Sequence, residues 1–203
     1  AAFRYAFGRR GYFAIPAISA GCFLRAPPTA ATPDIQASLG LYSVQNIGET
    51  LHPFSGVTAV CCLLRPESKG FVRIKSADPR EAPAINPNYL ASEKDCDTML
   101  HGLRAVRRIL QAPAIQHHIA EEFEPGPACN SDDELLDYAR RRGSTVYPPV
   151  SPCRMGRDST AVVDERLRVR GFAGLRVIDA SVMPSLVSGN TNAATIMIDR
   201  KST

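Results

Sequence analysis

The chain has 203 residues, of which 44% are hydrophobic and 22% charged, and its formal net charge is +4. These values are typical of a globular chain that buries a core as one domain, or as one domain and a segment of another, and they exclude a disordered or fibrous protein. The positive charge comes from scattered arginines, and the one tight run, at 140–142, ends a predicted helix where cations are favoured, so we expect no nucleic-acid partner.

The six cysteines form no CxxC pair and have no metal-ligand spacing with the four histidines. We therefore expect neither a zinc site nor a redox motif, and no metal. This usage favours free thiols in a reducing compartment, while the even number of cysteines leaves disulfides open as the alternative.

Arg4, Arg9 and Arg10 precede an apolar stretch at 12–24, and the first acidic residue is Asp34. This pattern resembles a targeting segment. We expect no cleavable segment, because the chain begins with Ala and because Pro16 interrupts the stretch. The longest largely apolar run, at 57–64, is too short to span a bilayer. We predict a cytoplasmic or otherwise soluble protein with no transmembrane segment.

The first 38 residues contain several prolines and small residues, and we expect an extended lead-in with little regular structure. Strands are predicted at 36–44, 57–65 and 71–75. The last two strands flank the turn sequence Pro-Glu-Ser-Lys-Gly and are predicted to form a β-hairpin. Alternation in the third strand is that of an antiparallel sheet with one wet face.

Two helices follow the predicted strands. The first is predicted at 93–111, because Ser92 and Asp95 resemble a capping box and apolar residues then recur at helical spacing. The second begins after Ser131, which has Glu134 three residues on, and ends at Gly143. Antiparallel strands with two amphipathic helices predict an α+β fold, in which the helices lie on one side of an antiparallel sheet.

The last sixty residues have a different character. Prolines crowd the stretch 147–156, short strands are predicted at 167–169 and 175–178, and a helix is predicted at 193–201 with Asn192 as its cap. A buried strand that ends in Asp179 thus leads through a loop to a helix start, whose unpaired N–H groups suit a developing anion. An ordinary Asn-capped helix packed on a strand explains the same pattern, so these residues alone name no cofactor.

Several motifs in order carry a resemblance to a known family. Asp-Ala-Ser-Val-Met-Pro at 179–184 and Ser-Gly-Asn-Thr-Asn-Ala at 188–193 resemble the carboxy-terminal signature of the glucose-methanol-choline (GMC) oxidoreductases. The similarity includes Cys-Arg-Met-Gly at 153–156, Val-Arg-Ile-Lys-Ser-Ala-Asp-Pro at 72–79 and Pro-Ala-Ile-Asn-Pro-Asn-Tyr-Leu at 83–90. It covers almost the whole chain. The resemblance implies the carboxy-terminal part of an FAD-dependent alcohol oxidoreductase of the choline dehydrogenase-like kind.

The same resemblance implies which residues contact FAD. Asp179 and Ala180 would lie along the ribityl and pyrophosphate of the cofactor. Asn192 and Ala193 would present the helix start to the pyrimidine edge of the flavin, with Thr195 as a further cofactor-binding residue. Hydride that arrives at flavin N5 leaves negative charge near N1 and C2=O, which helix N–H groups stabilise.

The implied catalytic pair is incomplete. Asn190 matches its second member, which hydrogen-bonds the alkoxide of a small alcohol substrate; an ordinary loop residue is the alternative. Its first member, the histidine base of Tyr-His-Pro-Val-Gly-Thr-Cys-Arg-Met-Gly, is replaced by Pro148, which cannot accept a proton. No histidine follows His118, and His52 is expected to be a solvated or packed residue.

A second departure concerns the nucleotide. Enzymes of this family hold the ADP half of FAD with a GxGxxG turn, and no such motif occurs among the fourteen glycines. The chain is therefore expected to need a missing amino-terminal FAD-binding half.

The resemblance divides the chain into an extended lead-in at 1–38, a substrate-binding domain at 39–145 and a returning segment of the FAD-binding domain at 146–203. Two hypotheses follow from this division and from the two departures. The chain is either the carboxy-terminal portion of a flavin enzyme, inactive alone, or a degenerate remnant that binds neither FAD nor substrate.

Overall fold

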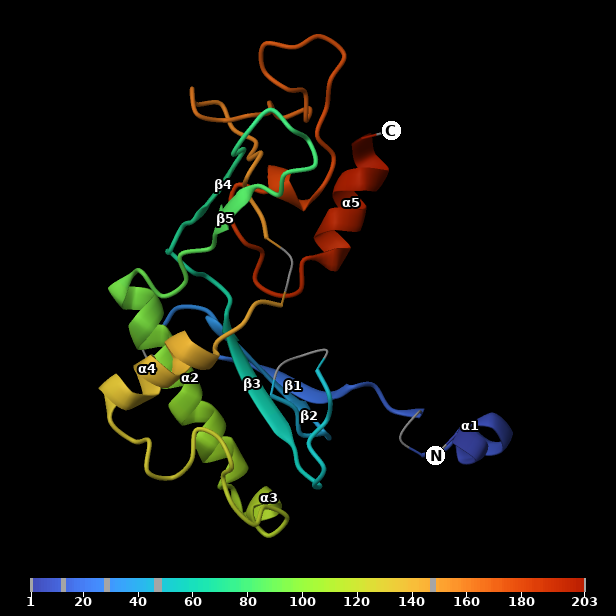
Figure 1. Cartoon of the computed structure of the whole chain (residues 1–203), viewed down its shortest axis with the longest axis vertical. Helices are drawn as coiled ribbons and strands as arrows, with labels where there is room; N and C mark the ends of the chain where they lie inside the picture. The colour runs from blue at the N-terminus through green and yellow to red at the C-terminus, as the bar shows by residue number, and fades with distance from the viewer. Residues whose placement is uncertain (1, 12–13, 28–29, 46–48, 147–148, 203) are drawn as a thin grey trace. The chain divides into compact units, whose positions relative to one another are not determined.

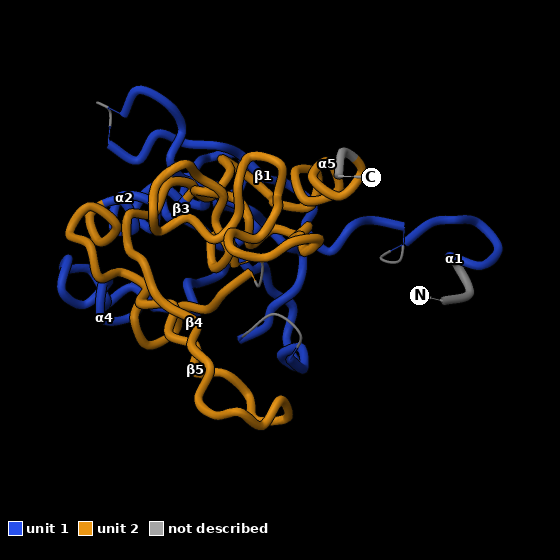
Figure 2. The backbone as a smooth tube through the Cα atoms, turned by 90° about the horizontal axis from the view of Figure 1, so that it is seen from above, with its two compact units in different colours: residues 1–63, 98–138 blue, residues 64–97, 139–203 orange. Residues whose placement is uncertain are grey.

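The computed structural model of the protein describes residues 2–11, 14–27, 30–45, 49–146 and 149–202 (Figure 1). Strands and helices are mixed and all paired strands are antiparallel, so the predicted α+β class is confirmed. The chain forms two compact units, one from residues 1–63 and 98–138 and the other from residues 64–97 and 139–203 (Figure 2). In the described part of the chain, no helix is both long enough and apolar enough to cross a membrane.

The first unit contains a three-stranded sheet. Strands β1 (Ile18–Leu24), β2 (Ile35–Gly40) and β3 (Thr58–Leu63) are hydrogen-bonded in the order β1-β2-β3. A short helix, α1 (Ala2–Gly8), precedes them. The expectation of little regular structure before residue 38 is therefore wrong, because the segment rich in proline and small residues pairs across the sheet with the apolar β2, whose Ile35 and Ala37 are buried.

Helix α2 (Glu93–Leu110) matches its predicted range closely, and its second half packs on this sheet. A Cβ atom at Gly102 would lie 2.9 Å from Ile35 Cδ1 and 3.5 Å from Cys61 Sγ, so the helix approaches the sheet closely at this glycine. Burial, followed by the neighbouring thiol of Cys62, raises the pKa of Cys61 to about 12. All six cysteines are free, as predicted.

The predicted hairpin between 57–65 and 71–75 is wrong. Strand β3 pairs with β2, whereas β4 (Phe71–Arg73) pairs with β5 (Ala84–Asn86). The turn between β3 and β4 is bound to the start of α2, because the buried carboxylate of Asp95 accepts hydrogen bonds from the N–H groups of Glu67 (2.9 Å) and Ser68 (2.8 Å). Asp95 thus fixes a turn that is distant in sequence, and the expected capping box with Ser92 is not how its carboxylate is used.

The second predicted capping box is confirmed. The Ser131 hydroxyl accepts from the N–H of Glu134 at 3.3 Å, and the Glu134 carboxylate accepts from the N–H of Ser131 at 2.9 Å. These bonds begin helix α4 (Asp132–Arg142), whose Leu135 is fully buried. The N–H groups of Ser131 and Asn130, which donate to the Glu134 carboxylate, hold its pKa below the usual value. A single-turn helix, α3 (Pro113–Gln116), lies between α2 and α4 in the chain.

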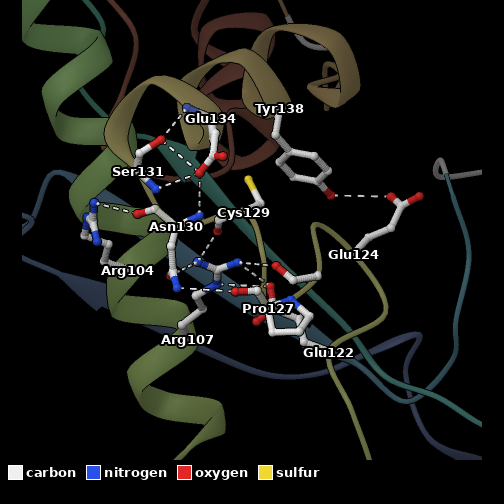
Figure 3. Close-up of polar contacts among 11 residues, drawn as sticks. Arg104, Arg107, Glu122, Glu124, Pro127, Cys129, Asn130, Ser131, Glu134 and Tyr138 are labelled. Carbon is white, nitrogen blue, oxygen red and sulfur yellow. Dashed lines mark hydrogen bonds and ion pairs between the residues drawn. The ribbon is translucent and has the colours of Figure 1, made fainter.

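One arginine holds the loop between α3 and α4 (Figure 3). Arg107 of α2 donates two hydrogen bonds to Glu122 Oε1, at 3.0 and 2.6 Å, and its side chain is only 16% exposed. It also donates to the carbonyls of Gly126 (3.1 Å) and Cys129 (2.8 Å) and to Asn130 Oδ1 (3.2 Å). The guanidinium fork thus ties a loop without regular structure to the helix.

We predict that Arg107→Ala lowers the free energy of unfolding by about 2 kcal/mol, because it leaves a half-buried carboxylate and two carbonyls without their donor. Urea unfolding followed by circular dichroism measures the change. Arg104→Ala is the matched control on the same helix: its ion pair with Asp132 is exposed, so we expect a loss below about 1 kcal/mol. Equal losses in the two variants would contradict the central role of Arg107.

Candidate functional site

The second unit brings two of the family-like motifs together through the backbone. The N–H of Cys153 donates to the carbonyl of Ser181 at 3.1 Å, and the N–H of Met155 donates to the carbonyl of Val182 at 2.8 Å. The hydroxyl of Ser151 donates to the carbonyl of Met183 at 2.8 Å. The Cys-Arg-Met-Gly stretch therefore lies along the Asp-Ala-Ser-Val-Met-Pro stretch, although about 25 residues separate the two motifs.

A small apolar core supports this pairing. Val163 and Val182 are fully buried and pack with Leu167, and five partly buried side chains surround them: Met155, Val169, Val177, Ile178 and Ile198. The predicted strands at 167–169 and 175–178 are reduced to bridged residues, with the N–H of Val177 donating to the carbonyl of Leu167 at 3.1 Å. The Cys-Arg-Met-Gly and Asp-Ala-Ser-Val-Met-Pro motifs thus each contribute a side chain to one shared core, Met155 and Val182 respectively.

Asp179 stands at the start of a one-turn 3₁₀ helix, η2 (Ala180–Val182). Its carboxylate accepts a hydrogen bond from the N–H of Ser181 at 2.7 Å, and the side chain is otherwise exposed. Ala180, the second residue expected along the flavin, is half-buried within η2. Asp179 thus caps, and Ala180 begins, the short helix that packs against α5 (Asn192–Ser202).

Helix α5 begins one residue earlier than predicted, at Asn192. The carbonyl that accepts the first helical bond is that of the buried Thr191, which receives both the N–H and the hydroxyl of Thr195 at 2.9 Å. The expectation that Asn192 precedes and caps the helix is therefore wrong; it lies in the first turn. Asn192 and Ala193 are exposed, and the Thr195 hydroxyl is committed to the backbone.

The structure describes one member of the expected catalytic pair, Asn190. Asn190 is exposed and lies two residues before α5. Pro148 lies outside the described residues. His52 belongs to the other unit, where its Nδ1 lies 2.8 Å from Ser43 Oγ and its ring stacks on Phe54 at 5.1 Å, so it is a packed histidine, as expected.

Ser151 is a feature that sequence reasoning missed. Its φ of 80° lies in the left-handed region, which favours glycine, and the family stretch that it resembles has glycine at this position. The signal was present in the sequence as the Gly-to-Ser difference, but only the backbone shows that the glycine-like conformation is retained. The hydrogen bond from the hydroxyl to Met183 offsets part of the cost.

Two ion pairs between arginine and aspartate lie in residues 154–168. Arg154 donates two hydrogen bonds to Asp158, at 2.9 and 2.6 Å, and holds the pKa of that carboxyl well below its usual range. Arg168 donates to Asp164 at 2.8 Å and lowers the pKa of Asp164 to about 2. Both pairs have the spacing i, i+4, which was visible in the sequence. Each pair joins a half-buried group, Arg154 or Asp164, to an exposed partner, so we assign both pairs to loop geometry rather than to chemistry.

Among the residues that the structure describes, no group of three histidine, cysteine, aspartate or glutamate side chains could hold a metal ion. What the segment offers instead is a helix start with exposed Asn192 and Ala193 and, on the adjacent η2, the exposed Asp179. Backbone N–H groups in the first turn of a helix lack intrahelical acceptors and favour an anion.

Comparison with known proteins assigns the family. Residues 66–198 match the family model described as GMC oxidoreductase, in its carboxy-terminal domain. The chain belongs to the GMC oxidoreductase family.

Two curated relatives are similar over almost the whole chain. An alcohol dehydrogenase [acceptor] of Pseudomonas putida is 42% identical over 196 residues, which are 97% of this chain and 36% of that protein. An oxygen-dependent choline dehydrogenase of Escherichia coli is 38% identical over 195 residues, which are 96% of this chain and 35% of that protein. The chain thus spans just over a third of the length of these relatives.

Solved structures agree on the fold. The pyridoxine 4-oxidase from Mesorbium loti superimposes with a TM-score of 0.78 and 27% identity, over 92% of this chain and 37% of that one. A formate oxidase of Aspergillus oryzae, in a structure concerned with FAD modification, gives a TM-score of 0.83 at 22% identity, over 99% of this chain and 40% of that one. The predicted family is confirmed, and FAD is the cofactor expected for it.

The conformation of Ser151 gives a prediction for stability. Ser151→Ala removes the hydroxyl and keeps the left-handed strain, so we expect a loss of about 1 kcal/mol in the free energy of unfolding. Ser151→Gly loses the same hydrogen bond but relieves the strain, so the glycine variant should be about 1 kcal/mol more stable than the alanine variant. Chemical unfolding of both variants tests this, and an alanine variant as stable as the glycine variant would refute the strain.

Proposed function

We propose that this chain supplies the flavin-facing carboxy-terminal portion of an FAD-dependent alcohol oxidoreductase, and that it does not oxidise alcohols alone. The observation that carries the proposal is the pairing of residues 151–155 with residues 181–183, next to η2 and the exposed start of α5. The names of the relatives support an alcohol as the substrate class. The particular alcohol depends on a pocket to which other parts of the enzyme contribute.

FAD fits the groups that this segment offers. Asn192 and Ala193 at the start of α5 would hold the pyrimidine edge of the flavin, and Asp179 and Ala180 on η2 would hold the ribityl and pyrophosphate region. The donor set is suitable because helix N–H groups favour the negative charge of a reduced flavin. Bound FAD would supply the acceptor for the hydride of the alcohol. Thr195 would act indirectly, since its hydroxyl bonds the carbonyl of Thr191.

Asn190 is proposed to orient the substrate oxygen through its side-chain amide. An amide donates a hydrogen bond to an alkoxide but cannot remove the alcohol proton, which is the task of a general base. Pro148 stands at the position of that base in the sequence motif and has no titratable group. Proton removal is therefore the step for which this chain provides no group at the expected position.

The division at residues 38 and 145 enters the proposal as a lead-in, a substrate-binding domain and a returning segment of the FAD-binding domain. The amino-terminal half that holds the ADP would be the partner of this chain. The absence of a GxGxxG sequence supports this partner, as does the 36% of the Pseudomonas relative that the chain spans.

A degenerate remnant is the second candidate. Pro148 favours it, because a family member that has lost its base keeps the fold but not the reaction. Such a protein would keep the core around Val163 and Val182, which contains none of the residues expected to bind FAD or substrate.

We predict that the purified chain carries no stoichiometric flavin and reduces no dye in the presence of alcohols, because it lacks the nucleotide turn. Visible absorbance after gel filtration measures bound flavin. As the comparison, the chain is joined to the part of the Pseudomonas relative that it does not cover, and this joined protein should retain flavin. Stoichiometric flavin on the isolated chain would contradict the proposal, and a folded joined protein without flavin would favour the remnant.

In the joined protein, we predict that Pro148→His raises alcohol-dependent dye reduction by about a hundredfold to ten-thousandfold, the usual contribution of a general base. The neighbouring Pro149→His is the matched control and should leave the rate unchanged. The assigned position is wrong if Pro148→His stays as inactive as Pro149→His while both bind flavin fully.

A further inference from the structure

Residues 166–176, called the 166–176 loop, leave the small core of the second unit and return to it. The N–H of Val169 donates to the carbonyl of Leu175 at 2.9 Å and closes the loop. Leu167 and Val177, which lie on either side of this bond, both belong to the core. The base of the loop is therefore fixed, and the residues between 169 and 175 form a tight turn.

The tip of this loop is apolar and exposed. Every residue from 170 to 176 is exposed, and Phe172 and Leu175 have 68% and 50% of their surface in solvent. Gly171 and Gly174 have φ of 80° and 73°, which favours glycine, and a Cβ atom at either would meet no atom within 4 Å beyond its chain neighbours. The phenylalanine therefore stands at a turn with open space around it.

Arginines flank this apolar tip. The 166–176 loop contains four arginines and no acidic residue. The side chains of Arg166 and Arg176 have no polar partner in the described part of the chain. The acidic residues that precede the loop, Asp164 and Glu165, are each paired with an arginine. The loop thus carries a net positive charge even when Asp164, which pairs with one of its arginines, is counted.

We propose that the 166–176 loop binds the surface of a membrane that contains anionic phospholipids. An apolar tip flanked by cations matches the layers of such a surface, where hydrocarbon lies beneath phosphate groups. Phe172 and Leu175 would enter the boundary between headgroups and acyl chains. The long side chains of Arg166 and Arg176 would reach the phosphates. An acidic protein would account for the arginines but not for the exposed ring, so a lipid surface explains both features.

Co-sedimentation with phospholipid vesicles tests the proposal on the purified chain. We expect vesicles of equimolar phosphatidylcholine and phosphatidylglycerol to bind the chain roughly tenfold more tightly than vesicles of phosphatidylcholine alone, because each arginine near an anionic surface strengthens binding. Added salt should weaken this binding, since it screens the charges. The protein joined to the Pseudomonas segment should bind the anionic vesicles as tightly as the chain alone. Equal binding to both kinds of vesicle, or loss of binding in the joined protein, would overturn the proposal.

Variants of the loop separate its two contributions. Phe172→Ser should weaken binding to the anionic vesicles by roughly tenfold, because it removes the inserted ring. Arg166→Gln combined with Arg176→Gln should weaken it by a similar factor of roughly ten and reduce its dependence on salt. Ile74→Ser is the matched control, because it changes an apolar residue of the same unit that is 89% exposed and has basic neighbours, and it should leave binding unchanged. Equal losses in Phe172→Ser and Ile74→Ser would contradict insertion of the loop. Binding that depends on the arginines but not on Phe172 would indicate a purely electrostatic contact, as with an acidic protein, and would overturn the membrane assignment.

Discussion

The backbone pairing of residues 151–155 with residues 181–183 is the constraint on which the carboxy-terminal segment depends. Three hydrogen bonds join the two stretches, and Met155 and Val182 of the paired residues belong to the small core around Val163. Because α5 packs on the same core through Ile198, the start of that helix is fixed relative to Asp179. A segment with little regular structure thus holds the groups expected around a flavin through a core of only a few side chains.

The sequence predicted correctly those elements that depend on contacts between neighbouring residues. The helix α2 and the Ser131–Glu134 capping box depend on neighbours within a few residues, and both are present. The hairpin predicted after β3 does not form, because Asp95, which is 27 residues away from Ser68, binds the turn and determines its path. No periodicity within a strand carries information about such a contact.

The candidate site was also predicted only in part from the sequence. Resemblance gave the family and the residues Asp179, Asn190 and Asn192, and the structure adds that Thr191 supplies the cap carbonyl. Helix boundaries of this kind shift by a residue because several polar side chains in a row suit the cap equally well. The strain at Ser151 had only an indirect sign in the sequence, which is the serine in place of the glycine of the family stretch, and the backbone shows that the left-handed conformation is retained. The resemblance thus identified the family and its expected site residues. The structure adds the strained backbone conformation that Ser151 adopts.

Cys22, Ala37 and Cys61 lie in one row across the three strands, and the two thiols of this row differ in their exposure. At one end, the half-buried Cys61 has a pKa raised to about 12, so it is a neutral thiol at physiological pH and a poor nucleophile. At the other end, Cys22 is exposed to reagents. An alkylating fluorophore would therefore meet β1 first, and a single sheet carries both a protected thiol and an accessible labelling position two strands apart.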